Sequence, residues 1–172
     1  MKVFVTCFAI AVCFSSGISF AACDRSKTAS TPSARFTLNE TMAFDQKTKL
    51  TWSRCSVGTV WKNGNCSGAA KLMSLGEAKE YAKKLGGGWR VPTIEELFSI
   101  VEQKCSSPAI NSEVFPSVKD LGEGSAPYWS TTKIKEIPLL IYYIDFFKRR
   151  GRWSYQGVCN GSTSSSWRQV KP

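Results

Sequence analysis

Hydrophobic and polar positions alternate in short runs near the start of the chain, which is typical of β-strands. Segments 35–38, 42–45 and 50–53 each place aromatic, aliphatic or β-branched residues between polar turns. This pattern predicts an antiparallel meander. A hairpin-like loop is expected to follow, because Asn63 and Gly64 both tolerate the positive φ angles of a tight turn.

The hydrophobic period changes to that of a helix after residue 73. Ser74 and Glu77 are spaced as a capping box, and Gly86 is a helix stop. The apolar residues between them recur at i, i+3, i+4 and i+7 and therefore share one face. They are Ala78, Tyr81, Ala82 and Leu85.

A second helix is predicted to begin at Thr93, which has the capping-box spacing to Glu96. Its expected buried residues are Leu97, Ile100 and Val101. The short connection from Gly86 to Pro92 is expected to place Trp89, Val91 and Leu97 in the core. Arg90 is expected to form a structural ion pair with a carboxylate.

The most strand-like run of the chain is 139–147, which is predicted to be a central strand buried on both faces. Shorter strands are predicted at 128–132, near 153–155 and at 167–170, the last of them at a sheet edge. The pattern as a whole predicts one compact domain with two helices and with strands before and after them.

The N-terminus carries a short apolar run followed by small residues, which predicts a secretory signal peptide over residues 1–21. Residues 22–34 are polar and rich in Ser and Thr, which predicts a leader or tether. The folded domain is then expected over 35–172. An exported location follows, in the periplasm, on the cell surface or in the medium.

Export implies an oxidising compartment, so the cysteines that follow the signal peptide are expected to form disulfides. Cys55 and Cys66 form the easiest bridge to propose, and Cys105 can pair with Cys159 or with Cys23. Phe20-Ala21-Ala22-Cys23 also resembles a bacterial lipobox, which makes Cys23 a lipidation candidate. Membrane attachment is expected only if Cys23 is lipidated.

The formal charge of +10 favours polyanionic partners, such as acidic polysaccharide, although excess charge also keeps a protein soluble. Export makes nucleic acid an unlikely partner. The local candidate is a basic turn with adjacent aromatic residues, since Arg forks bind sulfate and carboxylate and aromatic faces stack on sugars. This basic segment contains Lys148, Arg149, Arg150, Arg152, Trp153 and Tyr155. The alternative is a solvated hairpin tip.

Catalytic and metal chemistry find little support in the residue types present. The chain has no His and no Cys-x-x-Cys, so a zinc or thioredoxin-like site is not indicated. Glu95 and Glu96 are adjacent, and a helix would point them about 100° apart. We therefore expect no enzyme activity, no cofactor and no metal site.

Several motifs follow one another in a fixed order along residues 35–171. They include Lys47-Thr48-Lys49-Leu50-Thr51-Trp52, Gly88-Trp89-Arg90-Val91-Pro92-Thr93-Ile94-Glu95-Glu96-Leu97, Tyr128-Trp129-Ser130-Thr131-Thr132 and Trp167-Arg168-Gln169-Val170. In this order they resemble the Lcl C-terminal domain family. The family usually has Gly where Lys49 stands here.

The resemblance implies a C-type-lectin-like α+β fold, with two helices packed on a twisted antiparallel sheet. It also implies placement on the surface or in the periplasm, and some family members resemble adhesin domains that bind sulfated glycosaminoglycans. The expected function is a non-enzymatic binding domain for sulfated or acidic polysaccharide. The alternative is a structural or accessory envelope protein that contacts other proteins.

Overall fold

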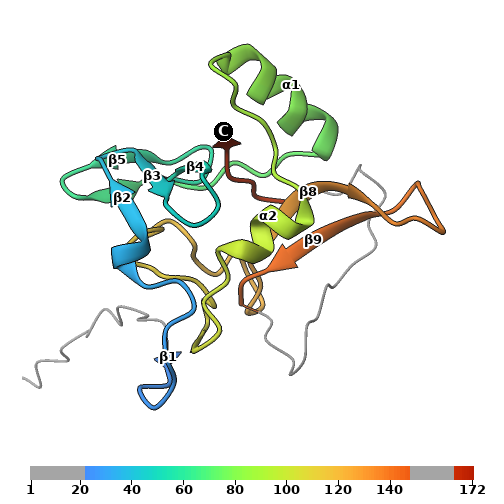
Figure 1. Ribbon diagram of the computed structural model, residues 1–172. Helices are drawn as coiled ribbons and strands as arrows, with labels where there is room; N and C mark the ends of the chain where they lie inside the picture. Colours follow the sequence, from blue (N-terminus) through green and yellow to red (C-terminus); the bar gives the residue numbers. More distant parts are fainter. Residues whose placement is uncertain (1–21, 148–164) are drawn as a thin grey trace, which may run out of the picture.

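The computed structural model describes residues 22–147 and 165–172. Its largest sheet has four antiparallel strands in the order β10-β4-β3-β2 (Figure 1). The strands are β2 (Phe36–Leu38), β3 (Met42–Asp45), β4 (Thr51–Ser53) and β10 (Val170–Lys171). The predicted meander and the edge position of the last strand are both confirmed.

The register of this sheet buries one face of each strand. Ala43 on β3 lies opposite Trp52 on β4, and Trp52 in turn lies opposite Val170 on β10. All three side chains are fully buried. These side chains join the first and last parts of the chain across the sheet. A shift of the strand register by one residue would turn them toward solvent.

Helix α1 (Leu75–Leu85) begins and ends as the sequence predicts. The Ser74 Oγ accepts a hydrogen bond from the Glu77 backbone N–H, and the Glu77 carboxylate accepts one from the Ser74 N–H. The helix buries Leu75, Ala78 and Ala82. Leu85 is exposed, so its expected burial is wrong, because the helix ends there and nothing packs over its last turn.

Helix α2 (Ile94–Ser99) also has the predicted capping box at Thr93, but it is shorter than the hydrophobic pattern suggested. Ile94 and Leu97 are buried, and Ile100 caps the C-terminal end from a buried position. Val101 is only partly buried, because the chain has left the helix there and pairs with Ile110 through an isolated bridge.

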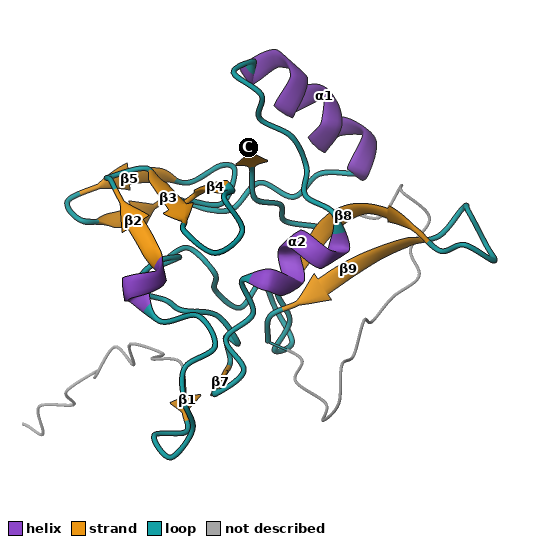
Figure 2. Cartoon of the chain, viewed as in Figure 1, coloured by secondary structure: helices purple, strands orange, loops and turns teal. Residues whose placement is uncertain are grey.

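Strand β8 (Pro127–Lys133) pairs with β9 (Ile141–Asp145) as a separate two-stranded ribbon, and α2 packs against both strands (Figure 2). The expectation of a central strand buried on both faces is wrong for the described residues. Strand β9 has only β8 as a neighbour there, and Tyr142 and Tyr143 are partly exposed.

Two further antiparallel pairs are each fastened by a disulfide. Strands β5 (Val60–Lys62) and β6 (Asn65–Ser67) form the expected hairpin, with positive φ angles at its two turn residues. The predicted Cys55–Cys66 disulfide is present beside it. Strand β1 (Ala22–Cys23) pairs with β7 (Cys105–Ser106), which were expected to lie in a tether and a loop.

The buried side chains form two clusters. The larger one fills the space between the four-stranded sheet, α2 and the β8–β9 ribbon, and it includes Trp52 and Phe115. The smaller one lies under α1 and includes Trp129 and Trp167. The α1 residue Tyr81 contacts Trp167 edge-on, at 5.6 Å between ring centroids. Tryptophan side chains are thus the largest members of both clusters.

Candidate functional site

The basic segment singled out in the sequence lies outside the described residues. The same is true of Cys159 and of the predicted signal peptide. The candidate roles of these residues therefore stay predictions. The described part of the chain offers two other places to examine, a polar pocket and a basic surface.

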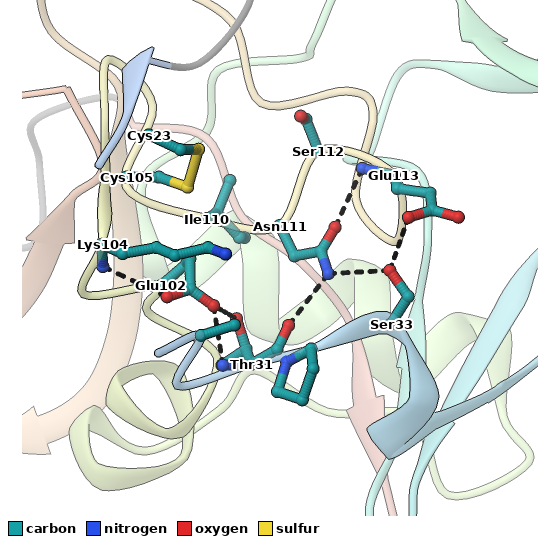
Figure 3. A pocket seen from close by; sticks show the side chains of 12 residues that line it. Cys23, Thr31, Ser33, Glu102, Lys104, Cys105, Ile110, Asn111, Ser112 and Glu113 are labelled. Atoms are coloured by element: carbon teal, nitrogen blue, oxygen red, sulfur yellow. Dashed lines mark hydrogen bonds between the residues drawn. A yellow bond between two sulfur atoms is a disulfide. The ribbon is translucent and has the colours of Figure 1, made fainter. Parts of the chain in front are cut away.

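The pocket lies between residues 29–33 and residues 102–113 and has a volume of about 350 Å³ (Figure 3). Glu102 stands in its wall and is only 2% exposed. Its carboxylate accepts hydrogen bonds from the backbone N–H groups of Ser30, Thr31 and Lys104, at 3.0, 2.7 and 3.1 Å. The Ser30 and Thr31 hydroxyls donate to it as well.

These contacts decide the charge of Glu102. Burial by itself raises the pKa of a carboxyl, but the backbone hydrogen bonds from Ser30, Thr31 and Lys104 and the Thr31 hydroxyl outweigh it. The net result is a pKa below the usual value for glutamate. Glu102 is therefore an ionised acceptor with several donors, and a general acid would need the opposite shift.

Asn111 extends the same set of contacts along the pocket. Its Nδ2 donates to the Thr31 carbonyl at 2.9 Å and to the Ser33 hydroxyl at 3.1 Å. Its Oδ1 accepts from the backbone N–H groups of Glu113 and Val114. These polar groups thus hold residues 30–33 against the domain, and the pocket lies along a structural seam between this segment and the rest of the domain.

The Cys23–Cys105 disulfide closes one end of this seam. It selects one of the two pairings that the sequence left open for Cys105. A sulfur atom in a disulfide cannot also carry the thioether of a lipid anchor, so in this structure the Cys23 sulfur is not available for lipidation. Thr31 is 1% exposed, so the end of the expected tether is packed against the domain.

The basic surface arises from an asymmetry between acidic and basic side chains. Many carboxylates, buried and exposed, accept hydrogen bonds from groups close to them in the fold. Examples are the buried Asp45, which pairs with Arg35, and Asp120, which accepts from the N–H groups of Gly122, Gly124 and Ser125. The exposed lysines, in contrast, have no carboxylate within 4 Å among the described residues, apart from Lys27. Their positive charge therefore faces solvent without a local partner.

One aromatic side chain lies within this basic surface. The last turn of helix α1 carries Lys83 and Lys84, and the three glycines that follow the helix, 86–88, have positive φ angles and lead to Trp89. Trp89 is partly exposed, so its expected core position is wrong. The Lys171 Nζ stands 4.8 Å from the centroid of the Trp89 ring. The backbone of Arg90 pairs with Val170, which holds the two segments together.

The expected ion pair of Arg90 is present and supports this edge. Its guanidinium donates two hydrogen bonds to Glu96, at 2.7 and 2.6 Å. Glu96 also accepts from the Thr93 N–H, so the same carboxylate caps α2. The hydrogen bonds from Arg90 lower the pKa of Glu96 and keep it ionised. The connection between the helices is therefore held in two ways, by the backbone pairing of Arg90 with Val170 and by its ion pair with Glu96.

Arg168 is a residue whose position sequence reasoning missed. It is fully buried without a carboxylate partner among the described residues, and its guanidinium lies 4.8 Å from the centroid of the Phe115 ring. It donates to the Ser117 hydroxyl at 3.1 Å. Burial lowers its pKa, and Tyr128 partly offsets this. Arg168 lies next to Trp167 in a segment whose pattern predicted only an edge strand.

The described residues contain no group of three or more His, Cys, Asp or Glu side chains arranged to hold a metal ion. None of the helices in 22–147 and 165–172 is long and apolar enough to cross a bilayer.

The fold and the surface define a small, disulfide-stapled α+β domain with an unpaired basic exterior. The family model described as the Lcl C-terminal domain matches residues 41–171, so the chain belongs to the Lcl C-terminal domain family. The match begins a few residues after the predicted start of the domain. Neither the curated proteins nor the solved structures include a significant match.

Proposed function

We propose that this protein is an exported, non-enzymatic binding domain for sulfated or carboxylated polysaccharide. One observation carries the proposal, namely the exposed lysines that lack carboxylate partners, while many acidic groups already accept hydrogen bonds or form ion pairs within the chain. Unpaired cations on the surface raise the local concentration of a polyanion and bind it in a salt-dependent way. The two disulfides are consistent with export.

The edge formed by Lys83, Lys84, Trp89 and Lys171 is the described surface that fits such a ligand best. A lysine over an indole ring leaves an aromatic face beside a cation, and a sulfated sugar presents both a ring face and an anion. The basic segment that begins at Lys148 is the second candidate surface. Under this proposal the fold is C-type-lectin-like, as the family resemblance implies.

The test is retention on heparin-agarose in a salt gradient, with the chain from Ala22 onward. We expect Lys83→Gln/Lys84→Gln/Lys171→Gln to elute at clearly lower salt than the unaltered protein. A matched control removes three charges elsewhere, at Lys62, Lys71 and Lys119, which are exposed. Equal losses in both triple variants would indicate general ion exchange and would remove the assignment to the Trp89 edge.

A second set of measurements separates charge from fit. Trp89→Ala keeps every charge, so a loss of affinity for sulfated oligosaccharide would show that the indole face takes part. Replacing Lys148, Arg149, Arg150 and Arg152 by Gln tests the second surface in the same assay. If none of these variants weakens binding, or if the unaltered protein is not retained at low salt, the proposed function is wrong.

The alternative is a structural or accessory envelope protein, and exposed apolar side chains favour it. Val60 on β5 and Leu72 before α1 are both largely exposed. Such side chains occur at protein contacts when they gather in one patch. The test is cross-linking of the protein in its native envelope. Neighbouring proteins that recur with the unaltered protein and are lost with Val60→Ser/Leu72→Ser would favour this alternative.

A further inference from the structure

The hairpin tip, residues 134–140, connects β8 to β9 and presents apolar side chains outward. Backbone hydrogen bonds from Ile134 to Leu140 and from Leu140 to Ile137 close the turn, at 2.8 and 2.9 Å. Leu139 is 80% exposed and Ile137 is 51% exposed. Pro138 between them is also exposed. The tip projects away from the rest of the described chain (Figure 1).

Two lysines stand on the strand side of these apolar residues. Lys133 is the last residue of β8, Lys135 follows it in the tip, and both are exposed. Neither has a carboxylate within 4 Å among the described residues, although Glu136 is the next residue along the chain. The tip thus combines an apolar end with unpaired positive charge, and it carries a single acidic side chain.

This combination fits a lipid surface better than a protein partner. A stable protein interface buries roughly 1,000 Å² or more and needs a complementary surface. A narrow tip with three exposed apolar residues cannot supply that area alone. The interface of a bilayer accepts apolar side chains without shape complementarity, and lysines beside it are attracted to anionic headgroups.

We propose that the hairpin tip inserts Ile137, Pro138 and Leu139 into the interface of an anionic lipid bilayer, with Lys133 and Lys135 at the headgroups. This contact requires no lipid on Cys23, which was the only membrane attachment expected from the sequence. It is also independent of polysaccharide binding, because the tip shares no residue with the Trp89 edge or with the basic segment.

The test is co-sedimentation of the chain from Ala22 onward with vesicles of mixed phosphatidylglycerol and phosphatidylcholine, and with vesicles of phosphatidylcholine alone. We expect binding to the anionic vesicles to be at least about tenfold weaker for Ile137→Ser/Leu139→Ser, because two large apolar side chains are no longer buried. Val60→Ser is the matched control, since Val60 is exposed on β5, and it should bind as the unaltered protein does.

Charge variants give the sharper result, because removing lysines should weaken binding to anionic vesicles and removing the acidic side chain should strengthen it. Lys133→Gln/Lys135→Gln should weaken binding by roughly fivefold for each lysine at low salt, and the difference should shrink as salt is added. Glu136→Gln removes the one acidic side chain of the tip and should strengthen binding to anionic vesicles. A variant that failed to fold would not give this gain.

Three outcomes would overturn the proposal. They are absence of binding to anionic vesicles, equal loss in Val60→Ser and in the tip variant, and no gain for Glu136→Gln. Retention of Ile137→Ser/Leu139→Ser on heparin-agarose should equal that of the unaltered protein. Loss of vesicle binding with full heparin retention therefore separates this inference from the proposed polysaccharide function.

Discussion

Two segments differ from what their composition suggests. The polar leader, residues 22–34, is packed against the domain, whereas the hairpin tip carries exposed apolar side chains. The leader is polar, yet Thr31 is buried and Ser30 and Thr31 both donate to the buried Glu102. The run from Leu139 to Phe147 is the most apolar segment of the described chain, yet it begins at a highly exposed leucine.

The difference shows that two kinds of interaction fix a segment in this fold. The leader is held by directed hydrogen bonds to one carboxylate and by a disulfide, which need few apolar atoms. The apolar run is held by burial of part of its side chains, since only Ile141, Ile144 and Phe146 are buried. Local hydrophobicity therefore did not indicate which segment is anchored.

The largest expected effect concerns the disulfide of the leader. The Cys23–Cys105 bridge joins residues 82 apart in sequence, and the Cys55–Cys66 bridge joins residues 11 apart. Loop-closure entropy predicts losses in the free energy of unfolding of about 4.5 kcal/mol for Cys23→Ala/Cys105→Ala and about 3 kcal/mol for Cys55→Ala/Cys66→Ala. Guanidinium unfolding of both variants measures the difference.

Peptide mapping without reduction is the control for this prediction. A peptide containing Cys23 linked to Cys105 is expected. A Cys105–Cys159 peptide, or an acyl mass on Cys23, would contradict the arrangement described here. An unfolding free energy of Cys23→Ala/Cys105→Ala equal to that of the unaltered protein would show that the disulfide of the leader does not stabilise the fold.

The next effect concerns the carboxylate that holds the leader. Glu102→Ala leaves the N–H groups of Ser30, Thr31 and Lys104 without an acceptor, so we expect the free energy of unfolding to fall by about 3 kcal/mol. Urea unfolding provides the measurement. Glu80→Ala is the matched control, because Glu80 is exposed on α1 and its removal should change stability by less than about 0.5 kcal/mol.

The pH dependence of stability tests the role of Glu102 by protonating its carboxylate, so no side-chain atoms are removed. Because the folded protein lowers the pKa of Glu102, the ionised form contributes stability above the unfolded pKa of about 4.3. That stability is lost as the pH falls through the lower folded pKa. The unaltered protein should therefore lose more stability between about pH 5 and pH 3 than Glu102→Gln does. Equal slopes would contradict the assigned role.

The smallest expected effect is at the hairpin tip. Leu139→Ala should change the free energy of unfolding by less than about 0.5 kcal/mol, because the side chain is already in solvent. Ile141→Ala, two residues further along, should cost about 3 kcal/mol, because Ile141 is buried under α1. Thermal or urea unfolding of the pair compares them directly, and similar costs would show that the tip packs against the domain.

Sequence reasoning succeeded where the interacting residues are close along the chain. Both capping boxes, the Asn63-Gly64 turn and the Cys55–Cys66 disulfide are present as predicted. The ion pair of Arg90 was predicted without its partner, which is Glu96 on the next helix. Each of these features depends on spacing and on backbone preference, which the sequence displays directly.

Sequence reasoning was least informative where the partners are far apart. Nothing near Ser30 and Thr31 indicated Glu102, and nothing near Arg168 indicated the Phe115 ring that covers it. Of the candidate site, the basic character followed from composition. The place of Trp89 beside Lys171 did not, because that contact joins residues that meet only through the pairing of Arg90 with Val170.

The sequence by itself determined the α+β class, the first residues of both helices, the end of α1, the meander, one disulfide and the membership of the Lcl C-terminal domain family. Only the tertiary structure decided the second disulfide, the docking of the leader on Glu102, the partial exposure of Trp89 and the exposed tip of the β8–β9 ribbon. The physical reason is that caps and turns are set by residues a few positions apart. Burial and long-range hydrogen bonds depend on which distant segments pack together, and the local pattern of hydrophobic and polar residues does not show this.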